Sequence, residues 1–256
     1  MRIKTLQWNI GGGKARKPED DPADALSYRF DVLDEFAGFI ARQRPDIITL
    51  QETHSDEESS QAQKIAQTMR MFFINDVYDK SHIEDGKGLG QAIISRFPIR
   101  NHTFDFFYNP KAEALGPDGK HWVSHDKGVT ACFLTMDNGL ILNVKASHSL
   151  PFRKFNIDPL SDGIFKLRAG MDEKLRPESD LYLCQADLNY DNSSIADFLP
   201  GLLRQGAKEV ILSEPTTPEG RRYDHVLYKG LKLVSAKVVS DVLSDHFPIV
   251  CEFETL

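Results

Sequence analysis

The chain of 256 residues carries 38 Asp and Glu against 31 Lys and Arg, which gives a net charge of −7 and a pI of about 5.6. Proteins that grip long nucleic acid without sequence preference usually present a basic surface, because phosphate contacts supply most of that affinity. The acidic balance therefore argues against that class of function. The hydrophobic fraction of 41% is ordinary for a globular protein, and the lack of repeats or linkers predicts one domain over residues 1–256.

The cysteines and the first residues bear on the compartment. Cys132, Cys184 and Cys251 lie in apolar stretches without close spacing, so we expect buried thiols rather than a zinc site or a disulfide framework. The start, MRIKTLQWNI, lacks the apolar segment of a signal peptide, and no run approaches ~18 apolar residues. These features predict a cytoplasmic protein with no integral membrane segment.

The first 52 residues read as strand, helix and strand. Residues 2–8 alternate polar and apolar side chains, as a half-buried strand does, and a glycine-rich loop follows. Residues 27–44 place apolar side chains on one helical face, with Ser27 as the expected N-cap. Residues 45–52 form a short apolar run that ends in polar residues. This order predicts a helix that covers a sheet.

The rest of the chain mixes helices with hairpin-linked strands. We expect helices at residues 59–70 and 158–175. A DNG sequence between two apolar runs is a hairpin signal. Such a mixture predicts an α/β fold of packed mixed sheets with helices outside. The expected strands are residues 90–99, 128–136, 140–147, 180–189, 221–230, 231–240 and 247–254.

Polar side chains recur where these apolar strands begin or end. Strands that run one way end where antiparallel neighbours begin, so such positions can converge on one rim of a sheet, where sites are commonly built. The side chains are those of Asn9, Glu52, His148, Asp187, Asn189, Asp224, Asp245 and His246.

The chemistry of this set is coherent. Glu52, Asp187 and Asp245 offer carboxylate oxygens, and Asn9 and Asn189 offer amide oxygens. Mg²⁺ or Mn²⁺ prefers such ligands, whereas zinc favours cysteine or a tighter set of histidines. A hard cation with histidines nearby is suited to the hydrolysis of phosphate esters.

Each residue alone also has an ordinary structural explanation. Asn9 would cap the turn into the glycine-rich loop, Glu52 would be a surface residue, and Asp187 would form an Asx turn. His246 would belong to a polar turn. The joint occurrence of these residues favours a site. The remaining alternatives are an Asx turn for Asn189, an exposed loop for His148, and a cross-strand pair for Asp224 and His225.

The motifs in chain order carry a family resemblance. WNI, LQE, SRFPI, a histidine after a strand, ADLN, YDHVLY and SDHFPI follow one another between Trp8 and Pro248. This series resembles the endonuclease/exonuclease/phosphatase superfamily of deoxyribonuclease-like, metal-dependent phosphoesterases. The resemblance implies a four-layered α/β sandwich with two central mixed β-sheets flanked by helices, and a site at one rim.

The resemblance also implies metal and water roles. Glu52 is expected as the principal metal ligand, with Asn9 and Asp245 as further ligands of Mg²⁺ or Mn²⁺. Asp187 is expected to orient or deprotonate the attacking water. Asn189 is expected to hold that water and the phosphate.

The histidines and nearby cations complete the implied site. By resemblance, His246 contacts the scissile phosphate, Asp224 orients its imidazole, and His148 is a second phosphate-contacting histidine. Arg153 and Lys154 follow His148 closely and are expected to bind a phosphate-rich substrate. The alternative for these two cations is solvated loop charge.

Two departures from the family pattern concern the strand ends. Ala186 stands where a glycine usually precedes the catalytic aspartate, and glycine permits tighter backbone geometry. His148 has no evident acidic partner, and the nearby segment offers only Gln91 and Lys87. Asp126 and Lys127 either face the site or begin a strand, and His225 is left out of the catalytic set.

Superfamily resemblance indicates the reaction more closely than the substrate. We expect Mg²⁺- or Mn²⁺-dependent hydrolysis of a phosphodiester in a nucleic acid or nucleotide-containing substrate. The alternative is a phosphomonoesterase, or a lipid phosphodiesterase of the inositol phosphate or sphingomyelin type, with the same site. A third possibility is a binding protein with an inactive site, against which every expected catalytic residue type is present.

Overall fold

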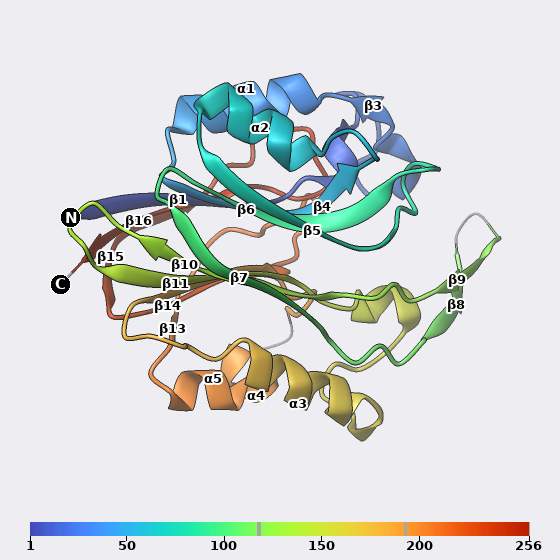
Figure 1. The fold of residues 1–256 in the computed structure, drawn as a ribbon. Coiled ribbons are helices and arrows are strands. Elements are labelled where there is room, and N and C mark those ends of the chain that lie inside the picture. The colour runs from blue at the N-terminus through green and yellow to red at the C-terminus, as the bar shows by residue number, and fades with distance from the viewer. Residues whose placement is uncertain (117–118, 192–193, 256) are drawn as a thin grey trace.

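A computed structural model describes residues 1–116, 119–191 and 194–255. Two six-stranded mixed sheets pack face to face, and helices cover the outer face of each (Figure 1). This arrangement confirms the four-layered α/β sandwich. That residues 1–256 form one domain stays a prediction. The helices are α1 (Leu33–Gln43) and α2 (Gln61–Met69) over the first sheet, and α3 (Phe165–Lys174), α4 (Ile195–Phe198) and α5 (Pro200–Arg204) over the second.

The first sheet contains one parallel pair among antiparallel neighbours. Its central strands β1 and β4 run in the same direction, so their carboxyl ends meet at one edge of the sheet. In spatial order the strands are β15 (Leu231–Val238), β16 (Ile249–Thr255), β1 (Arg2–Asn9), β4 (Ile47–Ser55), β6 (Gly88–Ser95) and β5 (Phe72–Lys80).

The second sheet repeats this plan. Its parallel pair is β11 and β12, while β10 and β11 form the hairpin predicted from the DNG sequence. In spatial order the strands are β13 (Lys208–Glu209), β14 (Asp224–Lys229), β12 (Tyr182–Asp187), β11 (Ile141–His148), β10 (Gly128–Thr135) and β7 (Ile99–Phe106).

Short elements decorate this framework. The hairpin of β8 (Glu113–Leu115) and β9 (His121–Val123) projects at the right of Figure 1. A second small ladder pairs β2 (Lys14–Ala15) with β3 (Phe30–Asp31). Single turns of 3-10 helix occur at Gly11–Gly13, Ala25–Ser27, Phe152–Phe155 and Asp162–Ile164.

The expected N-cap of the first helix is wrong. Ser27 ends a 3-10 turn, and α1 begins only at Leu33. The backbone N–H of Val32 donates to the carbonyl of Gly13, and Phe30 and Asp31 pair with β2, so the helix cannot begin before Val32. The Asp31 carboxylate instead accepts from the N–H of Leu33 at 3.2 Å.

Apolar side chains fill the three spaces between the four layers. Trp8 and Phe36 belong to the core between α1 and the first sheet, with ring centroids 4.3 Å apart. Ile93 and Val144 belong to the core between the two sheets. Tyr182 belongs to the core beneath the helices of the second sheet. This packing leaves the strand ends to carry the polar groups.

The thiols of Cys132, Cys184 and Cys251 are free and buried, as expected. Burial raises the pKa of all three above the ordinary value for a thiol. They therefore act as small hydrophobic core residues. Within the described residues, each helix is too short or too polar to cross a membrane.

Trp8→Phe is expected to lower the free energy of unfolding by at least about 1 kcal/mol, because the buried indole N–H donates to the carbonyl of His246 at 2.9 Å. Chemical denaturation monitored by circular dichroism measures this change. The only other tryptophan, Trp122 on β9, supplies the control, and Trp122→Phe is expected to change stability much less. Equal losses of stability in both variants would contradict the inference that the Trp8 indole N–H anchors the loop that contains His246.

Candidate active site

The predicted polar side chains converge on one rim because of strand direction. The parallel pair β1–β4 brings Asn9 and Gln51 side by side, and the parallel pair β11–β12 brings His148 beside Asp187. Strand β14 is antiparallel to β12 and begins there, with Asp224 opposite Asp187. The loop before β16 adds its residues at the same end. The expectation of convergence is therefore confirmed.

Glu52 lies on an irregularity in β4. Its φ of 53° is in the left-handed region, and the pairing with β6 shifts register between Gln51 and Thr53. A bulge of this kind re-aims a side chain, at a cost of order 1–3 kcal/mol for a strained non-glycine residue. The carboxylate of Glu52 lies 3.7 Å from Nε2 of His148 on the other sheet.

Asp187 lies at the centre of the cluster and is 1% exposed. Its Oδ2 accepts from Nδ2 of Asn9 at 2.9 Å, and its Oδ1 accepts from the backbone N–H of Asn189 at 3.0 Å. Nε2 of His148 and Nε2 of His246 lie 3.4 and 3.7 Å from Oδ2. Burial raises the pKa of Asp187 to about 6, a rise that His246 opposes and Asp224 reinforces. A carboxylate with this pKa is suited to accept a proton near neutral pH.

His246 is held by a carboxylate. Its Nδ1 lies 2.8 Å from Oδ2 of Asp224, whose Oδ1 accepts from Nε2 of Gln7 at 2.7 Å. Burial opposes the charged imidazolium, but the carboxylates of Asp224 and Asp187 outweigh burial and raise the pKa of His246 well above its ordinary value. His246 therefore carries a proton that it can share with a bound anion.

His148 has no carboxylate behind its ring. Its Nδ1 lies 2.9 Å from Nζ of Lys127 and 3.1 Å from Oη of Tyr78. Burial, reinforced by the charge of Lys127, lowers the pKa of His148 well below its ordinary value. Burial also lowers the pKa of Lys127 to about 8, although Glu52 and Asp187 oppose this. The two histidines thus lie in opposite electrostatic surroundings.

Three oxygen donors gather beside this centre in a way that suits a hard cation. The carbonyl oxygen of the Asn9 side chain accepts from the N–H of Gly11, and Gly11 packs so closely on Asp245 that a Cβ there would lie 2.9 Å from its Oδ1. Burial raises the pKa of Asp245; His246 opposes this rise, and the charge of Glu52 adds to it. Buried carboxylates that oppose each other's ionisation fit a divalent cation.

The electrostatic surroundings of Glu52 also favour a divalent cation at this place. Burial would raise its pKa, but positive charge nearby, on His148 when protonated and on Lys127, holds the pKa of Glu52 well below its usual range. Glu52 is therefore ionised and available as a ligand at neutral pH.

A second grouping also has the spacing of a metal site. One ligand atom from each of Asp187, Asp224 and His246 lies within 4.8 Å of the others. The hydrogen bond between His246 and Asp224 already joins two of the three donors. Asn9, Glu52 and Asp245 therefore stay the candidate metal ligands, and this group stays a candidate for proton transfer.

The remaining predicted residues lie near the rim but differ in their contacts. Asn189 follows Asp187 in a left-handed conformation, with φ of 50°. Arg153 is exposed and lies 3.9 Å from Glu219. Lys154 is exposed as well, and its charge opposes the raised pKa of Asp245. Both cations stay candidates for substrate binding.

The departures from the family pattern are explained by packing. Ala186 lies in the regular part of β12, paired with Ser147 and His225, so no glycine is required there. Gln91 donates to the backbone carbonyls of Gly128 and Ala146 between the sheets. Lys87 pairs with Asp56 at 2.7 Å and is not a partner of His148.

Asp126 and His225 have contacts away from the catalytic cluster. Asp126 lies 2.7 Å from Nζ of Lys111. His225 lies 2.7 Å from Glu209 and 2.8 Å from the carbonyl of Tyr190. These contacts support leaving His225 out of the catalytic set.

Sequence reasoning missed several residues of the cluster. Tyr78 and Gln7 gave no motif, and Lys127 was left open. His82 was not considered; burial lowers its pKa to about 4, and the negative charge of Glu52 opposes this. Its ring lies 5.0 Å from that of His125. The HDKG sequence was the one signal that could have indicated Lys127.

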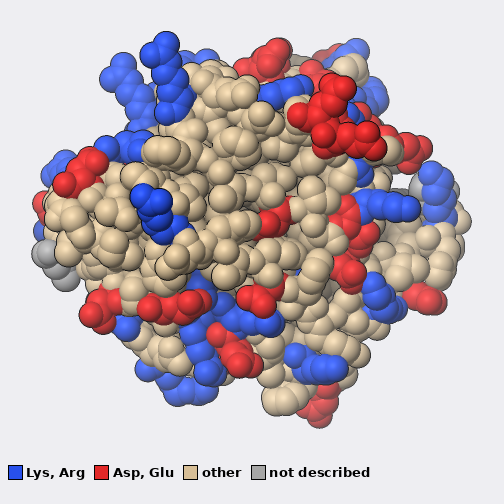
Figure 2. Space-filling view, viewed as in Figure 1, with Lys and Arg blue, Asp and Glu red and all other residues tan. Residues whose placement is uncertain are grey.

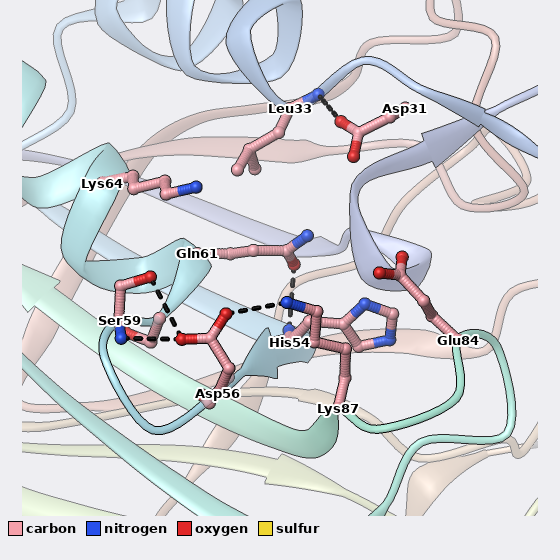
Figure 3. A pocket seen from close by; sticks show the side chains of 11 residues that line it. Asp31, Leu33, His54, Asp56, Ser59, Gln61, Lys64, Glu84 and Lys87 are labelled. Carbon is pink, nitrogen blue, oxygen red and sulfur yellow. Dashed lines mark hydrogen bonds and ion pairs between the residues drawn. The ribbon is translucent and has the colours of Figure 1, made fainter.

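A cavity of about 90 Å³ lies beside the site rather than within it. Figure 3 shows its lining around His54, which follows Glu52 by two residues on β4, with an ion pair between Lys87 and Asp56. Glu84 pairs with Lys14 at 2.9 Å. The side chains gathered around Asp187 are not among the residues that line this cavity.

Comparison with known proteins decides the family. Residues 6–130 match the model of the Endonuclease/Exonuclease/phosphatase family. The chain belongs to this family. Its members are hydrolytic phosphoesterases, and typically depend on a divalent metal, so the chain is a phosphoesterase of this superfamily. A search among curated protein sequences gave no match.

Solved structures agree with the family in fold. A family protein from Beutenbergia cavernae DSM 12333 has 17% identity and a TM-score of 0.74, over 99% of this chain and 72% of that one. A 3′ phosphatase from Neisseria, bound to a product DNA hairpin, has 16% identity and a TM-score of 0.64, over 98% and 99%. A mannosyl-6-phosphatase from Bacteroides thetaiotaomicron has 14% identity and a TM-score of 0.63, over 98% and 99%.

Proposed function

We propose that the chain hydrolyses phosphodiesters in a nucleic acid or nucleotide-containing substrate with Mg²⁺ or Mn²⁺. One observation carries the proposal. The buried carboxylate of Asp187 lies between the His246–Asp224 pair and the oxygen donors Asn9 and Glu52. This arrangement combines a base, a cationic donor and hard metal ligands around one point.

Asp187 acts as the base in this proposal. Its Oδ2 takes a proton from water as the water oxygen bonds to phosphorus and the phosphorus–leaving-group bond breaks. The amide of Asn9 and the N–H of Asn189 fix the two carboxylate oxygens for this step. Held by Glu52, Asn9 and Asp245, a divalent cation would neutralise charge on the phosphate oxygens and on the leaving group.

The histidines stabilise negative charge on the phosphate. Asp224 holds Nδ1 of His246, which leaves Nε2–H to donate to a phosphate oxygen. Nε2 of His148 lies 3.4 Å from the same Oδ2 of Asp187 that Nε2 of His246 approaches to 3.7 Å. Two such donors fit the two non-bridging oxygens and the leaving oxygen of a reacting phosphodiester.

The preference for nucleotide-containing substrates has its own support. The Neisseria relative holds a DNA hairpin. Tyr223 lies 6.4 Å from His246 between ring centroids and can contact a base or sugar beside the scissile phosphate. Figure 2 shows acidic and basic side chains interspersed over the face drawn there, which suits binding at a localised site rather than along a broad basic surface.

A phosphomonoester is the second candidate substrate. Both the Neisseria 3′ phosphatase and the Bacteroides thetaiotaomicron mannosyl-6-phosphatase share the fold and are named as phosphatases. The groups around Asp187 would serve a monoester equally well. A lipid phosphodiester is a further alternative with the same site.

The test is hydrolysis of bis(p-nitrophenyl) phosphate and p-nitrophenyl phosphate with Mg²⁺ or Mn²⁺, with and without chelator. Diester hydrolysis that the chelator abolishes supports the proposal, and short DNA, dinucleotide and lipid diesters are then compared. Faster turnover of the monoester would favour the second candidate. Turnover that survives the chelator would contradict the metal assignment.

Lys154→Ala is expected to raise KM roughly two- to fivefold with kcat little changed, which corresponds to about 0.5–1 kcal/mol for one exposed charge contact. The effect should shrink at high salt, because exposed charges are screened. Steady-state kinetics at two ionic strengths measure it. Lys232 on β15, which pairs with Glu254, provides the control lysine. An unchanged KM would indicate that Lys154 is solvated loop charge.

A further inference from the structure

The surroundings of the two ring nitrogens of His148 differ in a consistent way. Nδ1 faces two groups able to donate hydrogen bonds, Nζ of Lys127 at 2.9 Å and Oη of Tyr78 at 3.1 Å. Nε2 faces two acceptors, the carboxylates of Asp187 at 3.4 Å and Glu52 at 3.7 Å. Nζ of Lys127 is farther from Nε2, at 3.4 Å, than from Nδ1. Donors thus crowd one nitrogen and acceptors the other.

The chemistry of an ammonium group decides which nitrogen carries the proton. A lysine ammonium has three N–H donors and no lone pair. Lys127 also donates to Oη of Tyr78 at 3.3 Å, which leaves the phenolic hydrogen free to point at Nδ1 of His148. A protonated Nδ1 would set its N–H against the ammonium of Lys127, its nearest neighbour at 2.9 Å, and such a buried contact between two donors is costly.

The fold leaves little freedom to this group. Lys127, Tyr78 and His148 are 6%, 5% and 2% exposed. They come from the residue just before β10, from edge strand β5 and from the end of β11, so both sheets contribute. Lys127 Nζ also lies 4.8 Å from the centroid of the Tyr78 ring, a cation–π contact. The three side chains are therefore fixed relative to one another.

We propose that Lys127 and Tyr78 are positioning residues that hold His148 as the neutral tautomer with its proton on Nε2. His148 then presents one hydrogen-bond donor to the substrate phosphate and cannot serve as a base at Nε2. His246 differs, because its Nδ1 faces the carboxylate of Asp224 and therefore carries a proton. The statement about the substrate phosphate rests on the proposed function; the statement about the tautomer does not.

The first experiment reads the tautomer directly. Protein with ¹⁵N-labelled histidine is treated with chelator at neutral pH, and long-range ¹H–¹⁵N correlations are recorded, with His148→Gln assigning the signal among eight histidines. We expect Nδ1 of His148 without a proton and Nε2 with one. A proton on Nδ1 in the wild-type protein would overturn the proposal without any variant.

Variants then test whether Lys127 and Tyr78 are what keeps the proton of His148 on Nε2. In the double variant Lys127→Met with Tyr78→Phe, Nδ1 is expected to gain a proton, whereas Lys127→Arg, which retains only donors, should leave it bare. Tyr78→Phe alone is nearly isosteric and keeps the test open if the double variant does not fold. Lys145 is a buried lysine of β11, three residues before His148, and its ammonium bonds to Glu178 instead of to the ring. Lys145→Met is therefore the matched control and should leave His148 unchanged. An unprotonated Nδ1 in every variant would assign the tautomer to another cause.

Kinetics separate this inference from the proposed function. On the diester, Lys127→Met is expected to lower kcat by about 10-fold or more, with KM little changed, and Lys127→Arg should restore much of it. The expected tautomer in a protein without phosphoesterase turnover would refute the proposed function alone. Turnover with Nδ1 protonated would refute the positioning role alone.

Discussion

Asp187→Asn is expected to lower kcat by about 10²-fold or more, because an amide cannot take the proton from the attacking water. The substitution preserves shape, and its oxygen can still accept from Asn9 or from the N–H of Asn189. Loss of one accepted hydrogen bond is offset by removal of a buried charge, so the free energy of unfolding should change little. Steady-state turnover of the diester and denaturant unfolding measure the two quantities.

A buried aspartate outside the site provides the matched control. Asp172 on α3 accepts from the backbone N–H groups of Gly201 and Leu202, both at 2.8 Å. Asp172→Asn should lower stability by about 1–2 kcal/mol, because one N–H then faces an amide NH₂, and should leave kcat unchanged. Full activity of Asp187→Asn would show that another group activates the water.

The pH dependence of stability gives an independent view of Asp187. Burial raises its pKa from 3.8 to about 6, so between these values the folded chain holds a proton that the unfolded chain releases. The contribution of Asp187 to stability therefore rises as pH falls from 7 towards 4. In chelator-treated protein, the difference in unfolding free energy between the wild type and Asp187→Asn should shift in favour of the wild type over this window. A difference independent of pH would contradict the raised pKa.

Glu52→Gln is expected to weaken the binding of Mg²⁺ or Mn²⁺ by about 10-fold or more, since even partners outside the ligand shell alter affinity by 10–100-fold. The carboxylate is held well below its usual pKa and is ready to bind a cation without losing a proton. Removal of its charge also leaves Lys127 without the carboxylate 4.0 Å away, so a modest loss of stability should accompany it. Isothermal titration calorimetry measures the affinity.

Glu84 offers the control for this substitution. It lines the cavity of Figure 3 and pairs with Lys14, outside the cluster around Asp187. Glu84→Gln should leave metal affinity unchanged. If Glu84→Gln weakened binding and Glu52→Gln did not, the cation would belong to the cavity and not to the strand rim.

The strand-end residues were predictable because strand direction alone brings them together. Asp187 and Asp224 flank apolar runs that pair antiparallel in the second sheet, and His246 precedes an apolar run of the first sheet, at the same end of the sandwich. Ser27 shows the limit of such local patterns. The helix expected from Ser27 onward includes Phe30 and Asp31, which pair with β2, so the helix begins only at Leu33. No local pattern reveals which hydrogen bonds a distant segment will demand.

Tyr78 and Lys127 escaped prediction for a related reason. Tyr78 is the one buried residue of edge strand β5, whose other side chains are exposed or half-buried and show no clear alternation. Lys127 stands just before β10, where a lysine ordinarily meets solvent. Its burial depends on both sheets closing over it. Such three-dimensional neighbourhoods leave no trace in residue spacing.

The two sheets each hold half of the chemistry. Asn9 and Glu52 stand on one, Asp187 and His148 on the other, and Nε2 of Gln7 on β1 reaches across to Asp224 on β14. A chain in which both sheets had formed but not yet met would show its full complement of β-structure and no turnover. During refolding, the return of activity would therefore date the moment of docking between the layers, separately from the return of secondary structure. Formation of the catalytic cluster therefore reports on the docking of the two sheets.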